Sequence, residues 1–335
     1  MLHKKSDKRF PYLWAAIYGA LLTGYTVFTL LNVFVLPHDV VRPDDVSRPS
    51  AGAAEHSSAE SSPKTESAAV SSAAVSSASE EDMPVEENPD PIITANSYQS
   101  EGVSVTINTR RAYGTEIYIA DVVIKDPSYL RTALANGVFG RNITDFTSSM
   151  AEKNNAILAI NGDYYGFRDN GFVMRNGYLY RSTARPSSGD DALVIYTDGR
   201  MEIVDESGTD IEALTQTAGQ IFCFGPGLIR GGEIVVDESS EVDRSKASNP
   251  RTAIGEISPL HYILLVSDGR TAESRGLSLL ELAEVMRDSG CETAYNLDGG
   301  GSSTMWFMGR IVNRPTSNGT RISERSISDI VYIGE

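Results

Sequence analysis

The chain has 335 residues, a formal net charge of −16, four histidines and two cysteines. This acidic balance excludes the basic surface that a nucleic-acid-binding protein needs, and two cysteines do not make a disulfide scaffold. Residues 98–335 contain a single histidine, His261, so that part of the chain lacks the ligands for a zinc site built from imidazole and thiolate groups.

The N-terminal residues predict a membrane anchor. Residues 1–11 include the basic cluster HKKSDKR, and residues 12–36 contain no charged side chain. About 20 apolar residues are enough to cross the hydrocarbon core of a bilayer. Because basic flanks stay on the cytoplasmic side, we expect a cytoplasmic tail, one transmembrane helix over 12–36, and a cell-membrane protein whose bulk is extracellular. A cleavable signal peptide is the alternative, but its apolar region would be shorter.

Residues 37–97 form a second compositional zone, rich in Ser, Ala, Glu and Pro and poor in large apolar residues. Such a segment cannot bury enough surface to offset the entropy lost on ordering. We therefore expect a disordered linker that tethers the remaining residues, 98–335, which are long enough for one sizeable domain.

Hairpin signals dominate the domain. The apolar runs VSVTINTRR and TEIYIADVVI are separated by Tyr113–Gly114, and later runs are separated by Asn176–Gly177 and Asp198–Gly199. Asn-Gly and Asp-Gly between apolar runs are typical of tight turns between antiparallel strands. YILLVS is a short apolar run that fits a buried strand.

Two segments predict helices. TDFTSSMAEKNN, residues 144–155, favours a helix that begins near Thr144 or Asp145. LSLLELAEVMRDSG has apolar residues at helical spacing, and Ser278 and Glu281 fit a capping box. Because strands outnumber helices, we predict a single α+β domain of mixed, largely antiparallel sheets with a few packed helices.

Three apolar runs end in a carboxylate and a glycine turn. AILAI continues into Asn161-Gly162-Asp163, YILLVS into Asp268-Gly269-Arg270, and TAYNL into Asp298-Gly299-Gly300. If these strands are neighbours in one sheet, the three carboxylates meet at its edge. The alternative is that each sequence is an ordinary turn.

Elimination narrows the chemistry. GGGSS is not the nucleophile elbow of a serine hydrolase, and the run lacks the lysine of a phosphate-binding loop. Carboxylates, arginines, hydroxyls and backbone amides remain. Paired carboxylates cleave glycosidic bonds, while carboxylates with carbonyl groups could instead hold calcium or magnesium. The arginines near these acids favour an anionic substrate.

Several of these motifs together resemble the phosphodiester glycosidase family. They are NGDYY, FGPGLI, NPRTAIG, SDGR with SRGLSLLELAEVMRDSGC, NLDGGGSSTM and a late ERS, and they occur in the expected order over residues 100–335. A well-known animal member of the family removes N-acetylglucosamine from a phosphodiester, and bacterial members are often labelled exopolysaccharide-related. The resemblance therefore implies hydrolysis between a sugar anomeric carbon and a phosphodiester oxygen of a phosphorylated glycan.

The resemblance also implies that residues distant in sequence line one cleft: Asn161, Asp163, Arg251, Asp268, Asp298, Ser302, Ser303 and Arg325. We expect Asp163, Asp268 and Asp298 to be catalytic. Tyr165, Arg270 and the amides of Gly299, Gly300 and Gly301 are expected to contact the sugar phosphate, because successive backbone N–H groups bind anions. No cofactor is required, with a divalent cation, calcium or magnesium, as the open alternative. A metal-dependent phosphodiesterase and a non-catalytic glycan-binding or polysaccharide assembly module remain rival functions.

Overall fold

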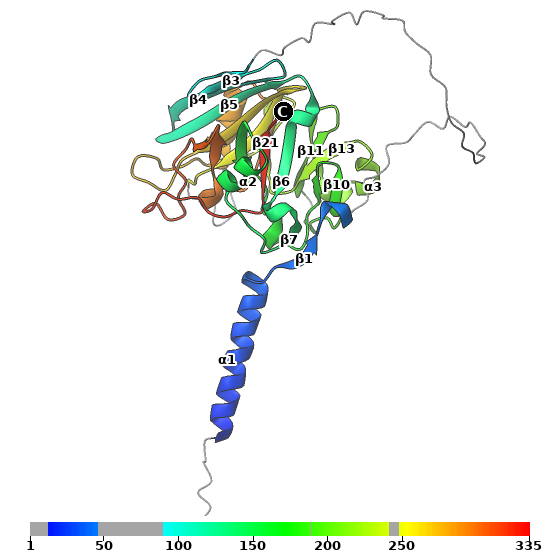
Figure 1. Cartoon of the computed structure of the whole chain (residues 1–335), viewed down its shortest axis with the longest axis vertical. Coiled ribbons are helices and arrows are strands. Elements are labelled where there is room, and N and C mark those ends of the chain that lie inside the picture. Colours follow the sequence, from blue (N-terminus) through cyan, green and yellow to red (C-terminus); the bar gives the residue numbers. More distant parts are fainter. Residues whose placement is uncertain (1–12, 46–89, 188, 241–247) are drawn as a thin grey trace, which may run out of the picture.

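The computed structural model describes residues 13–45, 90–187, 189–240 and 248–335 (Figure 1). Its largest sheet contains the hairpin that the Tyr113–Gly114 turn predicts, formed by β4 (Val103–Ala112) and β5 (Thr115–Ile124). Nine strands belong to this sheet, in the order β15-β14-β18-β16-β17-β5-β4-β3-β2. Its other strands are β2 (Ile92–Ile93), β3 (Ser97–Gln99), β14 (Gly227–Arg230), β15 (Glu233–Ile234), β16 (Thr252–Ser258), β17 (His261–Ser267) and β18 (Thr293–Asn296).

Two five-stranded sheets complete the domain, in the orders β10-β9-β13-β11-β12 and β20-β19-β8-β21-β6. The first contains β9 (Val173–Arg175), β10 (Tyr178–Arg181), β11 (Asp191–Tyr196), β12 (Met201–Asp205) and β13 (Ala218–Phe222). The second contains β6 (Leu130–Leu134), β8 (Leu158–Asn161), β19 (Met305–Phe307), β20 (Arg310–Ile311) and β21 (Asp329–Ile333). The hairpins predicted at Asn176–Gly177 and Asp198–Gly199 join β9 to β10 and β11 to β12.

The core follows the alternation of side chains along each strand. In β5, Val122 and Ile124 face a large cluster shared with the five-stranded sheets, whereas Ile117 and Ile119 face the helix α4 (Leu279–Asp288). Successive side chains of a strand point to opposite faces, so one strand serves both cores. Residue Ser278 caps α4 in a complete capping box with Glu281, as the sequence predicts. The short helix α3 (Ile211–Leu214) follows β12.

The fold class predicted from the sequence is confirmed, because all strand pairings are antiparallel and few helices accompany them. The helix expected to start near Thr144 or Asp145 instead begins later, as α2 (Thr147–Lys153). Asp145 is held extended by a bridge to Ile327, which delays the start of the helix.

The ends of the predicted linker are structured. β1 (His38–Val41) pairs with β7 (Phe139–Arg141), and β2 adds to the edge of the large sheet through β3. The prediction of disorder over residues 37–97 is therefore wrong at both ends, because these short segments find strand partners in the domain. Its central part, residues 46–89, lies outside the described residues, as does the basic tail.

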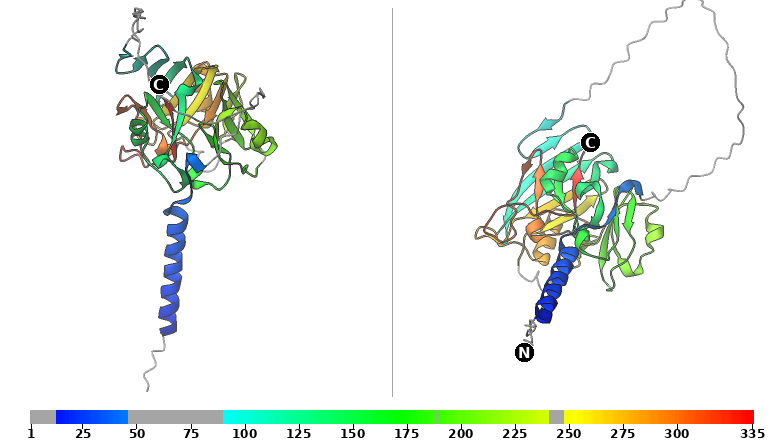
Figure 2. Two further views of the ribbon diagram at one scale, coloured as in Figure 1. Left: turned by 45° about the vertical axis from the view of Figure 1, so that its right-hand side comes forward. Right: turned by 60° about the horizontal axis from the view of Figure 1, so that its bottom comes forward.

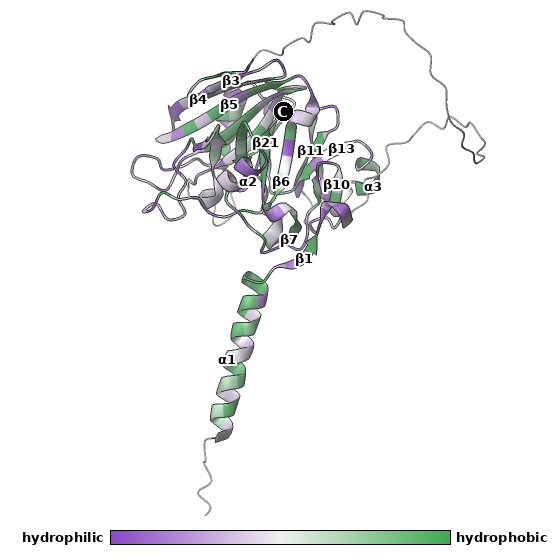
Figure 3. Cartoon of the chain, in the orientation of Figure 1, coloured by the Kyte–Doolittle hydropathy of each residue, from purple (hydrophilic) through white to green (hydrophobic). Residues whose placement is uncertain are grey.

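The apolar N-terminal segment forms one helix, α1 (Leu13–Phe34), that projects away from the sheets (Figures 1 and 2). Apolar residues cover most of its length (Figure 3). Residues Trp14–Phe34 are long and apolar enough to cross a membrane, and none of that span is buried against the rest of the protein. An N-terminal signal sequence can also satisfy these two criteria, so the helix by itself does not decide between an anchor and a signal sequence.

Candidate active site

Two strands from different sheets end side by side, and each is followed by an aspartate at the candidate site. β8 leads into Asp163 and β18 leads into Asp298. The Asp298 N–H donates to the Gly162 carbonyl at 3.1 Å, and the Asn161 side-chain amide donates to the Asp298 carbonyl at 2.6 Å. These bonds hold the two strand ends together even though the strands belong to separate sheets.

Both carboxylates line one cavity of about 460 Å³, which we call the carboxylate cavity. Its lining residues are Phe34, Val35, Asn142, Thr144, Asp163, Tyr164, Phe167, Asp298, Ser302, Arg325, Ser326, Ile327 and Ser328. The structure thus brings together four residues that the sequence predicts as one site: Asp163, Asp298, Ser302 and Arg325.

Asp298 is one of the two buried acids that line this cavity, with 7% of its surface exposed. Its Oδ1 accepts the Gly299 N–H at 2.9 Å and its Oδ2 accepts the Ser302 hydroxyl at 2.6 Å. Burial raises the pKa of the Asp298 carboxyl above its ordinary value, and the positive charge of Arg325 partly offsets this rise. Burial disfavours the charged form, so this carboxyl is suited to exchange a proton or attack a carbon.

Arg325 is the cation of the cavity. Its guanidinium lies 3.3 Å from Asp298 Oδ2, and its Nε donates to the Ser302 hydroxyl oxygen at 3.0 Å. The side chain is still 43% exposed, so the guanidinium can receive an anion from solvent without losing its position. A planar guanidinium pairs well with phosphate oxygens.

Asp163 has a different environment from Asp298. Its Oδ1 accepts the Tyr164 N–H at 2.6 Å and its Oδ2 accepts the Cys223 N–H at 2.9 Å. A buried arginine, Arg175, lies 3.5 Å from Oδ2 and donates through Nε to Asp329 at 2.7 Å. Each Asp163 oxygen accepts one protein N–H, and the residue lines the carboxylate cavity together with Asp298.

The glycine run is used for packing between loops. The Gly299 N–H donates to Asp298, the Gly300 N–H donates to the Pro250 carbonyl at 2.8 Å, and the Ser302 N–H donates to the Gly299 carbonyl at 3.3 Å. A Cβ on Gly300 would lie 2.7 Å from the Arg270 guanidinium. Two of the three amides expected to contact the phosphate, those of Gly299 and Gly300, therefore donate to acceptors of the protein itself.

Gly301→Ala is expected to destabilise the protein by about 1–3 kcal/mol, because overpacking a filled site forces neighbours to move. A Cβ at this position would meet Ser317 Oγ at 2.3 Å and Ser317 Cα at 3.1 Å. Gly208→Ala is the control, since nothing lies within 4 Å of a Cβ at that position. Urea unfolding of both variants measures the difference, and equal midpoints would contradict the packing role.

Three other predicted residues are held inside the protein away from the carboxylate cavity. Asn161 is fully buried, and its side-chain oxygen accepts the Thr252 hydroxyl at 2.8 Å and the Thr304 N–H at 3.1 Å. Tyr165 is 2% exposed and stacks on Phe139. Ser303 is also fully buried. None of the three is among the residues that line the carboxylate cavity.

Asp268 and Arg270 also lie outside the carboxylate cavity. Asp268 accepts the Arg314 N–H at 2.8 Å and the Tyr118 hydroxyl at 3.3 Å, and burial raises the pKa of its carboxyl. Arg270 donates to the Ser317 carbonyl at 2.6 Å. β17 and β18 end at the same edge of the sheet, on either side of the first residues of β16. Of the three strand-end carboxylates, Asp163 and Asp298 line the carboxylate cavity, and Asp268 does not.

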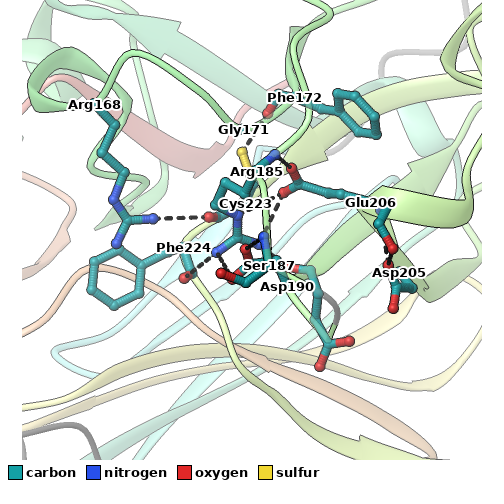
Figure 4. A network of polar contacts seen from close by, with 12 residues as sticks. Arg168, Gly171, Phe172, Arg185, Ser187, Asp190, Asp205, Glu206, Cys223 and Phe224 are labelled. Atoms are coloured by element: carbon teal, nitrogen blue, oxygen red, sulfur yellow. Dashed lines mark hydrogen bonds and ion pairs between the residues drawn. The ribbon is translucent and has the colours of Figure 1, made fainter.

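Arg251 lines a second cavity of about 340 Å³, which we call the arginine cavity. Arg168 and Arg185 also line it. Figure 4 shows the Arg185 guanidinium enclosed by protein acceptors, and these include Glu206 at 2.9 Å and the Phe224 carbonyl at 3.2 Å. Arg251 donates through Nε to the Leu277 carbonyl at 2.9 Å. The side chains of Arg185 and Arg251 thus hold loops together at the wall of the arginine cavity.

Aromatic residues of the carboxylate cavity were not predicted from the sequence. Tyr164 lines it and stacks on Phe167 with ring centroids 4.8 Å apart. The motif NGDYY marks a tyrosine pair beside Asp163, but the turn of chain at Tyr165–Phe167 buries the second tyrosine and leaves the first at the cavity. A sugar face can stack on such a ring, so Tyr164 is the better candidate for that contact.

Comparisons with known proteins connect this site to one family. The family model described as phosphodiester glycosidase matches residues 154–334, which include every strand-end carboxylate and Arg325. The SPbeta prophage-derived uncharacterized protein YomE of Bacillus subtilis (strain 168) is 30% identical over 201 residues, which are 58% of this chain and 30% of that protein. The N-acetylglucosamine-1-phosphodiester alpha-N-acetylglucosaminidase of Mus musculus is 35% identical over 103 residues, 27% of this chain and 20% of that enzyme.

A solved structure has the same fold. The zebrafish N-acetylglucosamine-1-phosphodiester alpha-N-acetylglucosaminidase catalytic domain, auto-inhibited by its pro-peptide, aligns with a TM-score of 0.56 and 21% identity. The alignment covers 70% of this chain and 83% of the zebrafish chain. The curated relatives are matched over 30% of their length or less.

Proposed function

Because this chain belongs to the phosphodiester glycosidase family, we propose that it hydrolyses the bond between a sugar anomeric carbon and a phosphodiester oxygen. The proposed substrate class is an N-acetylglucosamine-1-phosphodiester or a similar unit of a cell-surface or exogenous glycan. The observation that carries the proposal is the grouping of Asp298, Ser302 and Arg325 in one cavity. This group supplies a buried acid, Asp298, and an accessible cation, Arg325, which lie 3.3 Å apart.

In this proposal Arg325 binds the phosphate and Asp298 lies beside the anomeric carbon, as nucleophile or as base for water. The carbon–oxygen bond breaks, its electron pair leaves with the phosphate monoester, and water supplies the oxygen that ends on the sugar. A phosphate ester is a good leaving group, so the site needs mainly to stabilise its charge. Tyr164 lines the same cavity and would contact the sugar face.

The proposed location is the outer face of the cell membrane. At about 1.5 Å per residue, the 21-residue span of α1 is roughly 32 Å long, which matches a bilayer core. The basic residues before it favour a cytoplasmic N-terminus. The helix would then hold the catalytic domain outside the cell.

Hydrolysis in water labelled with oxygen-18 tests the proposed reaction. The substrate is the methyl ester of N-acetylglucosamine-1-phosphate, and the full-length protein is assayed with and without EDTA. We expect the label in the sugar and no dependence on the chelator. Label in the phosphate would favour a phosphodiesterase, and binding without turnover would favour a glycan-binding module. Within the described residues, no group of three or more His, Cys, Asp or Glu side chains is arranged to hold a metal ion.

Arg325→Gln is expected to lower kcat/KM by about 100-fold, as loss of a group that stabilises developing charge does. It should also move the acid limb of the pH profile to higher pH. Arg325 lowers the pKa of Asp298, so its removal raises that pKa, and a higher pH is then needed to ionise the carboxyl.

The control for this prediction is Arg230→Gln. Arg230 has a similar side-chain exposure, 39%, and pairs with Asp191 outside the carboxylate cavity. Its acid limb should coincide with that of the wild type in a kcat/KM profile between pH 4 and pH 8. If the acid limb of Arg325→Gln is not shifted, Arg325 does not influence the pKa of the group that governs this limb, and the prediction is wrong.

A further inference from the structure

The end of the apolar helix forms part of the carboxylate cavity. Phe34, the last residue of α1, and Val35 line it together with Asp298 and Arg325. Phe34 is 66% exposed, so the cavity opens past this side chain. The site that holds the buried acid is therefore next to the point where the chain leaves the proposed membrane span.

This placement is fixed by contacts. The Asn142 side-chain amide donates to the Val33 carbonyl at 3.2 Å and to the Leu36 carbonyl at 2.9 Å. Immediately afterwards the chain pairs with the domain, His38 with Arg141 and β1 with β7 along its length. Figures 1 and 2 show α1 leaving the domain at the face that carries β1 and β7.

The length of α1 sets the height of the cavity above the bilayer. Residues Trp14–Phe34 match the hydrocarbon core, so Phe34 lies at its boundary. The cavity that Phe34 lines is then within the headgroup layer, where the phosphates of membrane lipids lie. Phe167 lines the same cavity with 36% of its surface exposed, and such a ring suits the boundary between acyl chains and headgroups.

We propose that the substrate is a sugar-1-phosphodiester whose phosphate is esterified to a membrane lipid. The inference rests on the proposed function and specifies its substrate. The lipid remains in the bilayer beside Phe34, the phosphate meets Arg325, and the sugar enters the cavity toward Asp298 and Tyr164. Hydrolysis releases the sugar and leaves the phosphorylated lipid in the membrane.

Two esters of N-acetylglucosamine-1-phosphate test this inference with the full-length protein in phospholipid vesicles. One carries a dialkylglycerol and the other a methyl group. Because a shared surface raises the effective concentration, kcat/KM should be at least ~10-fold higher for the lipid ester. Inserting about twelve Gly/Ser residues between Leu36 and Pro37 allows the domain to move away from the membrane and should remove this preference, so that kcat/KM becomes equal for the two esters. The same insertion between Ser72 and Ala73 is the control and should leave the preference intact.

The outcomes separate the two proposals. Equal rates on both esters, or an unchanged preference after the Leu36–Pro37 insertion, would overturn the inference about the lipid and leave the proposed reaction standing. Turnover of neither ester would contradict the proposed function itself, and with it this inference.

A second measurement does not depend on activity. Cys223 and Cys291 are buried and unpaired, so a fluorophore can be directed to an introduced surface cysteine. Phe167→Cys places it at the cavity, and Val123→Cys places it at a similarly exposed position on β5, a strand that Figure 1 shows well away from α1. Quenchers attached to lipid acyl chains should quench the label at 167 and not the one at 123, and equal quenching would refute a membrane-facing cavity.

Discussion

Asp298→Asn is expected to lower kcat/KM by at least ~100-fold, the effect of removing a positioned acid, base or nucleophile, while the fold is retained. Asparagine has the same shape, and its side-chain oxygen can still accept the Ser302 hydroxyl or the Gly299 N–H that now bind the carboxylate. What it loses is the charge next to Arg325 and the ability to take a proton. Steady-state assays with the methyl ester of N-acetylglucosamine-1-phosphate, together with circular dichroism, measure both parts of this expectation.

Asp268→Asn is the matched control. Asp268 is another buried strand-end carboxyl whose pKa is raised by burial, but it lies outside the carboxylate cavity. We expect it to lose less than ~10-fold, because it touches neither the substrate nor Asp298 in the proposed mechanism. Equal losses of activity in the two variants would indicate that Asp268 is also catalytic, as the sequence suggests. Full activity of Asp298→Asn would show that Asp298 has no role in the mechanism.

Arg175→Met is expected to lower the free energy of unfolding by about 3–5 kcal/mol, the typical cost of removing one partner from a buried ion pair. Arg175 is 1% exposed, and it is the cation next to two buried carboxylates, Asp163 and Asp329. Without it both acids face each other with no compensating charge. Its guanidinium also lies 4.0 Å from the Phe222 ring centroid, a contact that methionine replaces only in part.

This loss should depend on pH. Burial raises the pKa of Asp329 to about 6 even with Arg175 present, and removing the cation raises it further. The folded variant therefore binds a proton more readily than the unfolded chain, so its stability falls as pH rises through this range. Denaturation at pH 5 and pH 7 should show the larger loss at pH 7. Arg110→Met, which breaks the exposed pair with Asp288, should change stability by less than about 1 kcal/mol.

Local features of the chain could be predicted because each depends on neighbouring residues. The turns at Tyr113–Gly114, Asn176–Gly177 and Asp198–Gly199 join strands as their dipeptides indicate, and Ser278 caps α4 with Glu281. The same holds for the strand ends that place Asp163 and Asp298, since an apolar run followed by an acid and glycine delivers that acid to the edge of a sheet.

Features that depend on distant contacts could not be predicted. The sequence does not reveal that Arg175 on β9 meets Asp329 on β21, because nothing local marks the pair. Nor does it reveal that Gly301 packs against Ser317, and without that contact the glycine run favours an anion site. Tyr165 was chosen over Tyr164 for a related reason, since a single turn of backbone decides which ring is buried.

β21 lies between β6 and β8 in its sheet, although both of these strands precede it by more than 160 residues in the chain. A nascent chain leaves the ribosome with β6 and β8 long before β21 is translated, so these strands wait with unsatisfied edges. The carboxylate of Asp329, which neutralises Arg175, is also delivered only at that late stage. Until β21 is translated, these open strand edges can pair with other chains, so the partly synthesised domain is prone to aggregation.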